Sequence, residues 1–217
     1  MENRDSFLAD IARQLGREVR LRPMPLPRPA SHHAQTRLVD LTAQQRCDAF
    51  IDVATNVMLA HCEVVLEADA AQAAQRLCDK YGNTPVIISD DPRLEALGIT
   101  ACLQRDCQAT VWDPRKGEEN LRLAEQAKVG VVYAEYGLTE SGGVVLFSAP
   151  ERGRAVSLLP ESSLFVLRKS TLLPRAAQLV HHLHPMAQPG ERFSSCIHIL
   201  GGPSSTAELY ITKVRGA

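Results

Sequence analysis

The stretch that decides the fold is residues 129–148, which read VGVVYAEYGLTESGGVVLFS. Its first six residues form an unbroken apolar run, which is typical of a strand buried on both faces of a sheet. Gly142 and Gly143 then separate the segment 133–138 from the apolar run 144–147. Paired glycines between two such segments favour a strand–turn–strand passage over a helical crossover. The stretch therefore predicts a buried strand followed by an antiparallel pair.

Further short apolar runs lie on both sides of this stretch, at residues 64–66, 85–89, 109–112, 164–168 and 197–200. Helical spacing of apolar side chains and capping residues predict helices near Thr42, after Asp69, at Pro92, over 118–128 and over 174–183. Unbroken apolar strands separated by helices imply βαβ units and a mainly parallel sheet. We therefore expect a three-layer α/β domain over residues 38–217, with an antiparallel addition in its second half.

Residues 1–37 are predicted to form an arm outside this domain. Apolar residues recur at helical spacing from Phe7 to Leu15, and the pattern stops at Gly16. Four prolines between residues 23 and 29 then exclude a helix or an inner strand. An isolated helix of this length is marginal in water, so its apolar face needs a partner surface. We expect a homo-oligomer formed through the arm; the alternative is a mobile arm.

Charge and composition exclude several classes of protein. The 217 residues carry 24 Lys+Arg against 25 Asp+Glu, a net charge of −1, whereas a nucleic-acid binder usually has a basic excess. No apolar stretch approaches the roughly 18 residues that span a bilayer, and the polar N-terminus shows no secretion signal. We therefore expect a cytoplasmic protein that binds neither nucleic acid nor a membrane.

The six cysteines are scattered, with no Cys-x-x-Cys pair. An iron–sulfur cluster or structural zinc site needs clustered ligands, so we expect these thiols to act as small buried apolar side chains. His181, His182 and His184 fall near the end of a predicted helix, where a solvated helix end is favoured over a metal site. The sequence predicts neither a metal nor a cofactor in this chain.

Residues 136–143, YGLTESGG, are the first candidate site. They place the carboxylate of Glu140 beside glycines that let a ligand approach the backbone closely. Glu140 is the candidate catalytic residue, as a base, nucleophile or hydroxyl acceptor, because a buried unpaired carboxylate is too costly to keep for packing alone. The ligand-binding residues predicted around it are Thr139, Ser141, Gly142 and Gly143. The alternative is a β-turn whose polar residues only bond to the backbone.

Residues 201–206, GGPSST, form the second candidate site, directly after the run 197–200. If that run is an inner strand, the loop lies at the carboxyl edge of the sheet, near Glu140, where ligands bind in parallel sheets. The residues expected to bind a small carboxylate or phosphate are Gly202, Ser204, Ser205 and Thr206. Glu140 would repel such an anion unless a cation such as Arg168 or Lys169 lies close. The alternative is a helix N-cap with redundant hydroxyls.

Three segments carry a resemblance to a known family. Residues 127–148, AKVGVVYAEYGLTESGGVVLFS, look like the signature of the lactate utilisation domain. Residues 202–207, GPSSTA, match the second motif of the same family, in the right order and at the right separation. With the N-terminal arm and QRCDAFI at 45–51, the chain resembles the lactate utilisation protein C family (LutC/YkgG) over most of its length.

This resemblance implies a fold similar to the superfamily of ribose-phosphate isomerase, glucosamine-phosphate deaminase and CoA-transferase. It also implies a role in oxidising L-lactate to pyruvate, alongside two partner proteins that carry iron–sulfur clusters. Because this chain lacks cluster ligands, it would be the cluster-free subunit. The resemblance assigns no catalytic step to that subunit.

The chain departs from the family at its end. Relatives usually continue the second motif as Ala-Asp-Ile-Glu, whereas this chain has Glu208 and Tyr210 at the acidic positions and stops at Ala217. A site built from this edge could therefore differ from that of the relatives. Two other functions also stay open. One is a stand-alone enzyme of the isomerase or CoA-transferase type that acts on a small anionic metabolite, and the other is a ligand-binding regulator without chemistry.

Overall fold

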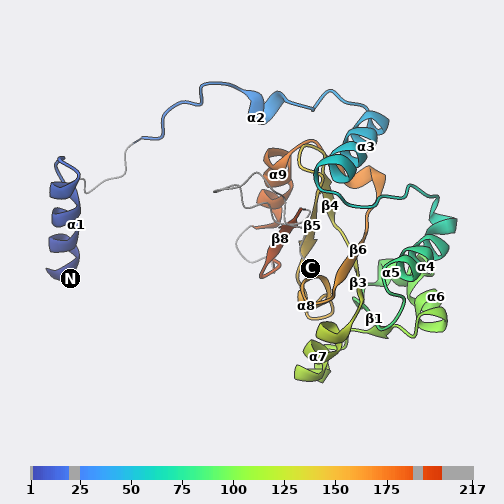
Figure 1. Ribbon diagram of the computed structural model, residues 1–217. Coiled ribbons are helices and arrows are strands. Elements are labelled where there is room, and N and C mark those ends of the chain that lie inside the picture. Colours follow the sequence, from blue (N-terminus) through green and yellow to red (C-terminus); the bar gives the residue numbers. More distant parts are fainter. Residues whose placement is uncertain (1, 20–24, 188–192, 202–217) are drawn as a thin grey trace. The chain divides into compact units, whose positions relative to one another are not determined.

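The computed structural model describes residues 2–19, 25–187 and 193–201 (Figure 1). The chain divides into two compact units, Met1–His32 and His33–Ala217. The first contains the helix α1 (Glu2–Gln14), which ends just before Gly16, where φ is 61°. The predicted N-terminal helix and its end at this glycine are therefore confirmed.

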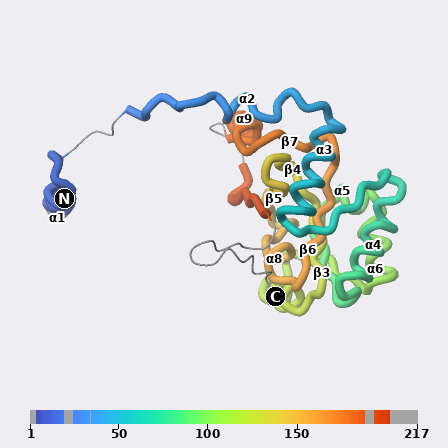
Figure 2. The backbone as a smooth tube through the Cα atoms, turned by 45° about the horizontal axis from the view of Figure 1, so that its top comes forward, coloured from blue at the N-terminus to red at the C-terminus, as the bar shows by residue number. Residues whose placement is uncertain are grey.

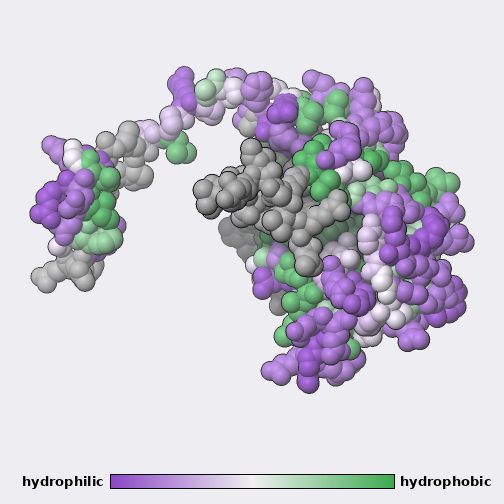
Figure 3. All heavy atoms as spheres, viewed as in Figure 1, coloured by the Kyte–Doolittle hydropathy of each residue, from purple (hydrophilic) through white to green (hydrophobic). Residues whose placement is uncertain are grey.

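One side of α1 is apolar and unusually exposed. Phe7 and Leu15 are 62% and 64% exposed, whereas Ala12 is buried. Figure 3 shows the apolar stripe along one side of the helix and hydrophilic side chains on the other. Between α1 and His33, the described residues contain neither helix nor strand. This agrees with the extended linker expected from the prolines.

Deletion of residues 1–30 is expected to leave the thermal unfolding midpoint of the protein nearly unchanged, because these residues belong to the separate N-terminal unit. The same deletion should weaken self-association or partner association, because the exposed apolar stripe of α1 needs a partner surface. Differential scanning calorimetry and sedimentation measure the two effects. A fall of more than about 10 °C would count against the arm interpretation, since it implies several kcal/mol of lost core contacts.

The larger unit is built on two four-stranded sheets. The first is parallel throughout, in the order β2-β1-β3-β6. Its strands are β1 (Val86–Ile88), β2 (Thr110–Val111), β3 (Val129–Tyr133) and β6 (Ser162–Val166). The short unbroken runs of Val and Ile bury both faces of β1 and β3, as predicted.

Helices cover both faces of this sheet. Val86 and Ile88 pack in one core cluster with side chains of α4 (Ala70–Lys80), α5 (Pro92–Ala96) and α6 (Ile99–Asp106). Ile87 points the other way, into a cluster with α7 (Glu118–Gln126) and α8 (Ala155–Leu158). Figures 1 and 2 show α4 and α6 on one side of the sheet and α8 on the other. The predicted three-layer α/β architecture is confirmed.

The second sheet is mixed, in the order β7-β4-β5-β8. Its strands are β4 (Tyr136–Leu138), β5 (Gly143–Phe147), β7 (Leu172–Leu173) and β8 (Ile197–Leu200). The chain passes directly from β3 into β4: the backbone N–H of Ala134 donates to Val166 in the first sheet, and that of Glu135 donates to Val145 in the second. β4 and β5 are antiparallel, which confirms the predicted strand–turn–strand passage.

Helices also pack on both faces of the second sheet. The helix α3 (Ala43–Asp52) begins with a capping box between Thr42 and Gln45 and continues as the π-helical turn η1 (Val53–Val57). Its Phe50 shares a core cluster with Val144 of β5. The helix α9 (Ala176–Met186) covers the opposite face and forms another cluster through Leu179.

Several boundaries differ from those predicted. Residues 64–66 form no strand, and Val64 and Leu66 are 68% and 74% exposed. Asp69 precedes α4, but its side chain makes no capping hydrogen bond, because the 3-10 turn η2 (Glu67–Asp69) already leads into the helix. The run 197–200 forms the strand β8, as predicted, but β8 is not the inner strand assumed for the second candidate site. It pairs antiparallel with β5 at an edge of the second sheet.

The remaining short elements are the helix α2 (His33–Thr36) and the 3-10 turns η3 (Pro114–Lys116) and η4 (Lys169–Thr171). α2 leads to Arg37, η3 follows β2, and η4 follows β6 by three residues.

Candidate functional site

The Glu140 loop is the tight turn between β4 and β5. The backbone N–H groups of Thr139 and Glu140 donate to the carbonyl oxygens of Leu173 and Pro174, at 2.9 and 3.0 Å. These bonds extend the parallel pairing of β4 with β7 by two residues. The position of Glu140 is thus fixed by the end of β7 and the start of α9.

The carboxylate of Glu140 is paired with two arginines. Arg175 Nε lies 2.5 Å from its Oε2, and Arg37 Nη1 lies 3.3 Å from its Oε1. Arg175 also donates to the backbone oxygen of His33, so the same guanidinium ties α2 to the turn. The carboxylate is 30% exposed. The prediction of a buried, unpaired carboxylate is therefore wrong, because the Glu140 carboxylate is partly exposed and forms ion pairs with two arginines.

The cations proposed to balance Glu140 were also the wrong ones. Arg168 pairs with Glu67 at 2.8 Å, and Lys169 donates to the side chain of Gln44. Arg37 and Arg175 take their place, so two positive charges surround one negative charge. The sequence contained one signal for Arg175: it directly follows Pro174, at the start of the predicted helix. That helix is α9, and Arg175 is its N-cap residue.

The other residues of the turn pack closely. Thr139 is buried, and its Oγ1 has no hydrogen-bond partner among the described residues. Ser141 Oγ accepts a bond from the N–H of Gly143 at 3.3 Å. Gly142 has φ of 65°, and a Cβ there would lie 2.8 Å from the backbone nitrogen of Ala54, so only glycine fits. These contacts give Ser141, Gly142 and Gly143 structural roles in the turn.

The second predicted loop falls largely outside the described residues. Gly202, Ser204, Ser205 and Thr206 all lie in residues 202–217, as do the divergent Glu208 and Tyr210. The strand before them is described: Leu200 lies opposite Val144, and a Cβ on Gly143 would lie 3.0 Å from the oxygen of Leu200. The end of β8 is therefore next to the Glu140 turn.

The structure reveals a second polar cluster, at the carboxyl ends of β1 and β3. In open α/β sheets, ligands bind at the carboxyl edge, at the point where the order of the strands reverses. In this sheet the order is β2-β1-β3-β6, so that point lies between β1 and β3. Arg93 is at its centre. Its guanidinium donates two bonds to Asp91, at 2.9 and 2.7 Å, and two to Glu135, at 2.6 and 2.7 Å.

Two further contacts complete this cluster. Arg152 donates to Glu135 at 2.6 Å and lies 3.9 Å from Asp91. The guanidinium of Arg93 also stacks over the ring of Tyr133 at 4.1 Å, a favourable cation–π arrangement. Two arginines thus face two carboxylates, and the charges of the cluster balance.

The electrostatics of Asp91 follow from this arrangement. Its side chain is only 1% exposed. Burial alone raises the pKa of this carboxyl, but the hydrogen bonds from the Arg93 side chain and backbone, together with the charges of Arg93 and Arg152, outweigh burial and hold the pKa below its ordinary value. Asp91 is therefore ionised at neutral pH and fixes the orientation of Arg93.

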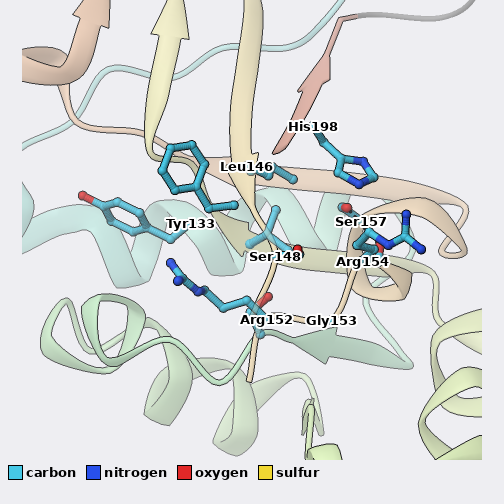
Figure 4. A pocket seen from close by; sticks show the side chains of 11 residues that line it. Tyr133, Leu146, Ser148, Arg152, Gly153, Arg154, Ser157 and His198 are labelled. Atoms are coloured by element: carbon cyan, nitrogen blue, oxygen red, sulfur yellow. Dashed lines mark hydrogen bonds between the residues drawn. The ribbon is translucent and has the colours of Figure 1, made fainter. Parts of the chain in front are cut away.

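An open groove borders the cluster. Its lining includes Arg93, Glu135 and Arg152 of the cluster, together with Ser148 and Phe193. A cavity opens from the groove between the two sheets, and it is lined by Ser148, Arg154, Ser157 and His198 among others (Figure 4). Sequence reasoning missed this site, although Glu135 ends an apolar run and Asp91-Pro92-Arg93 begins three residues after the end of β1.

Among the described residues, no group of three or more His, Cys, Asp or Glu side chains lies close enough to hold an ion. His181, His182 and His184 lie exposed on α9, and the ring of His182 stacks on Tyr136 at 5.4 Å. The solvated helix end predicted for these histidines agrees with their exposure.

The matching family is the LUD domain, whose model covers residues 49–217. The chain belongs to this family. It is also similar to proteins of known sequence over its whole length. It is 61% identical to the protein YkgG of Escherichia coli (strain K12) over 216 residues, covering 100% of this chain and 94% of that protein.

Two further relatives carry a more informative name. The chain is 36% identical to Lactate utilization protein C of Halalkalibacterium halodurans, covering 100% of this chain and 93% of that protein. It is 34% identical to Lactate utilization protein C of Bacillus subtilis (strain 168), with 100% and 92% covered. These two matches confirm the resemblance to the lactate utilisation protein C family.

One solved structure supports the fold. The crystal structure of a DUF162 family protein from Deinococcus radiodurans matches with a TM-score of 0.55, at 18% identity, and covers 75% of this chain and 90% of that chain. At this identity the likeness concerns the fold alone. In the described part of this chain, no helix is long and apolar enough to cross a bilayer.

Proposed function

We propose that this chain is the cluster-free component of a system that oxidises L-lactate to pyruvate together with iron–sulfur partner proteins. The observation that carries the proposal is the match, over 100% of this chain, to Lactate utilization protein C of two bacteria. Their name places those proteins in lactate utilisation. The role of this chain is to bind a small carboxylate and to work beside the partners that move the electrons.

The state of the cysteines supports the cluster-free assignment. Burial raises the pKa of the thiols of Cys62, Cys102 and Cys107, and it raises that of Cys78 to about 12. Thiolates, not thiols, ligate iron–sulfur clusters. The raised pKa values disfavour the thiolate form of these four cysteines, which supports our assignment of the electron-carrying clusters to the partner proteins.

We place the carboxylate ligand between the Glu140 turn and the loop of residues 202–206, which comes after β8 in the sequence. Arg175 and Arg37 supply two donors in reach of the turn, and a ligand carboxylate can exchange with Glu140 on these guanidinium groups. Glu140 is then free to accept the hydroxyl of a 2-hydroxy acid. Thr139 contributes a buried hydroxyl without a partner among the described residues, and Gly202, Ser204, Ser205 and Thr206 are proposed as further donors.

Co-purification tests the partner assignment. An affinity-tagged copy of the chain, expressed in cells growing on L-lactate, should retain two other proteins, and iron and acid-labile sulfide should be found in those proteins. The purified chain alone should contain neither. Stable iron and sulfide in the purified chain, or turnover of a sugar phosphate or acyl-CoA by the chain unaided, would instead favour an independent enzyme.

The variant Glu140→Gln is expected to fold normally and to lose function. Half-exposed ion pairs contribute about 1 kcal/mol or less, so the free energy of unfolding should fall by no more than that. Growth on L-lactate should nevertheless stop, because the amide cannot replace the charge in the exchange with Arg175. Glu63→Gln is the matched control, because Glu63 forms a 2.9 Å pair with Arg76 far from the turn along the chain. Normal growth with Glu140→Gln would reduce Glu140 to a turn residue.

A further inference from the structure

The cavity between the two sheets has a distinctive distribution of charge. Figure 4 shows Arg152 extending toward Tyr133, while Arg154 extends to the opposite side, where His198 and Ser157 lie. The charge of Arg152 is balanced by Glu135, which accepts its hydrogen bond at 2.6 Å. Arg154 has no carboxylate partner among the described residues, and its guanidinium donates a weak hydrogen bond of 3.9 Å to the sulfur of Cys196. One end of the cavity is therefore neutral and the other is positive.

An unsatisfied polar atom lies at the positive end. His198 Nε2 is buried and has no hydrogen-bond partner among the described residues. A buried donor or acceptor without a partner is unfavourable, so such an atom points to a missing binding partner. The cavity itself, at about 20 Å³, holds about one water-sized group, so a larger partner reaches His198 from the groove, where Arg154 also lies. The register of β8 explains its position: His198 lies opposite Leu146 of β5, and both line the cavity.

Hydrogen bonds hold the surrounding groups in place. Ser157 Oγ donates to the backbone oxygen of Arg154 at 3.1 Å, and Ser163 Oγ donates to the oxygen of Ser157 at 2.9 Å. Ser148 also lines the cavity, and its Oγ lies 3.3 Å from Ser194 Oγ. The segment that carries Arg154 is therefore anchored by its own hydrogen bonds, and Ser148 adds a hydroxyl to the lining.

We propose that Arg154 and His198 bind a small oxyanion, a carboxylate or a phosphate, at a site distinct from the Glu140 turn. The two sites lie at opposite ends of β4, because Glu135 precedes this strand and Glu140 follows it. The single unbalanced guanidinium favours an anion of low charge. The imidazole of His198 donates one hydrogen bond to it, and the balanced cluster of Arg93, Asp91, Glu135 and Arg152 forms the neutral wall beyond.

Site-resolved titration tests this site on the full-length chain. Inorganic phosphate, L-lactate and pyruvate are added separately, and the NMR signals of the His198 ring and of the backbone amides around Ser148 and Arg154 are followed. We expect saturable shifts at millimolar concentration for at least one probe. The probe that saturates at the lowest concentration distinguishes a phosphate ligand from a carboxylate ligand.

Three variants make the test decisive. Arg154→Gln should weaken binding at these signals at least tenfold, and Arg154→Lys should recover part of the loss by restoring the charge. Glu140→Gln should leave binding there unchanged, as should Arg122→Gln, which removes another exposed arginine, on α7. Binding unaffected by Arg154→Gln, loss of these shifts in Glu140→Gln, or no shift with any probe at tens of millimolar would each overturn the proposal.

Discussion

Replacement of Gly130 by alanine is expected to destabilise the protein by about 3 kcal/mol or more, or to prevent folding. Gly130 lies in β3, paired with Ile87 of β1 on one side and Ser163 of β6 on the other. A Cβ there would lie 1.8 Å from the backbone oxygen of Val156 and 2.8 Å from Cγ of Pro160. The backbone of α8 would have to move, because no flexible side chain can absorb the overlap with Val156.

The sign of this effect tests the packing of α8. In an extended strand, replacing glycine by alanine ordinarily raises the stability of the folded state by about 0.5–1 kcal/mol, so a loss of stability here must come from the close approach of α8. Gly201→Ala is the matched control, since among the described residues a Cβ there would meet only Met58 Sδ, at 3.7 Å. Denaturation in urea measures both variants. A Gly130→Ala protein within 1 kcal/mol of the wild type would contradict the packing of α8 on β3.

Replacement of Arg93 by methionine should destabilise the protein by about 2–4 kcal/mol, because it leaves the buried carboxylate of Asp91 without its main partner. The value is below that of a fully buried pair, since the Arg93 side chain is 35% exposed and Arg152 remains 3.9 Å from Asp91. The chain contains its own control. Asp113-Pro114-Arg115 repeats the same Asp-Pro-Arg arrangement with the same bidentate bonds, but Arg115 is 88% exposed.

Arg115→Met should therefore change the free energy of unfolding far less than Arg93→Met, because exposed ion pairs contribute little to stability. Equal losses in the Arg93 and Arg115 variants, measured by urea denaturation at pH 7, would show that burial of the Asp91 pair does not contribute. A loss confined to Arg93→Met would establish the cluster at the ends of β1 and β3 as a stabilising element of the groove.

The pH dependence of these variants has a definite sign. In the wild type the pKa of Asp91 lies below its ordinary value. The pair's contribution to stability is therefore fully present above the unfolded pKa of about 3.9 and is lost as the pH falls through the folded value. Without Arg93, burial raises the pKa of Asp91 in the folded state, so protonation favours folding. The deficit of Arg93→Met should shrink between pH 7 and pH 4, and a deficit that grows over this range would contradict the assignment.

Most elements of the fold could be predicted from the sequence, because the signals were local. The apolar runs of β1 and β3 and the caps at Thr42 and Asp91 each depend on neighbours within a few residues. The strand predicted at residues 64–66 does not form, and the reason is physical. A run of three apolar residues has no alternation that would specify a strand, and these three lie exposed between η1 and η2 without a strand partner. Strand order is also not a local property, so the edge position of β8 was not predictable from its composition.

The candidate sites depend even more on long-range contacts. The loop containing Glu140 was recognisable from its glycines, but its partners Arg37 and Arg175 lie far from it in the sequence. The same applies to the second cluster, where Arg93 and Glu135 are 42 residues apart and meet only because β1 and β3 are neighbours. An Asp-Pro-Arg motif after a strand predicts a helix cap. It does not predict the carboxylate that the arginine reaches.

The central claim, that this chain works in L-lactate oxidation, is tested most directly by growth. A bacterium from which its own Lactate utilization protein C has been deleted is given this chain and grown with L-lactate, or with pyruvate, as the sole carbon source. The account predicts that the chain restores growth on L-lactate and makes no difference on pyruvate, the product of the oxidation. No growth on L-lactate, with the chain folded and present at the level of the natural protein, would contradict it.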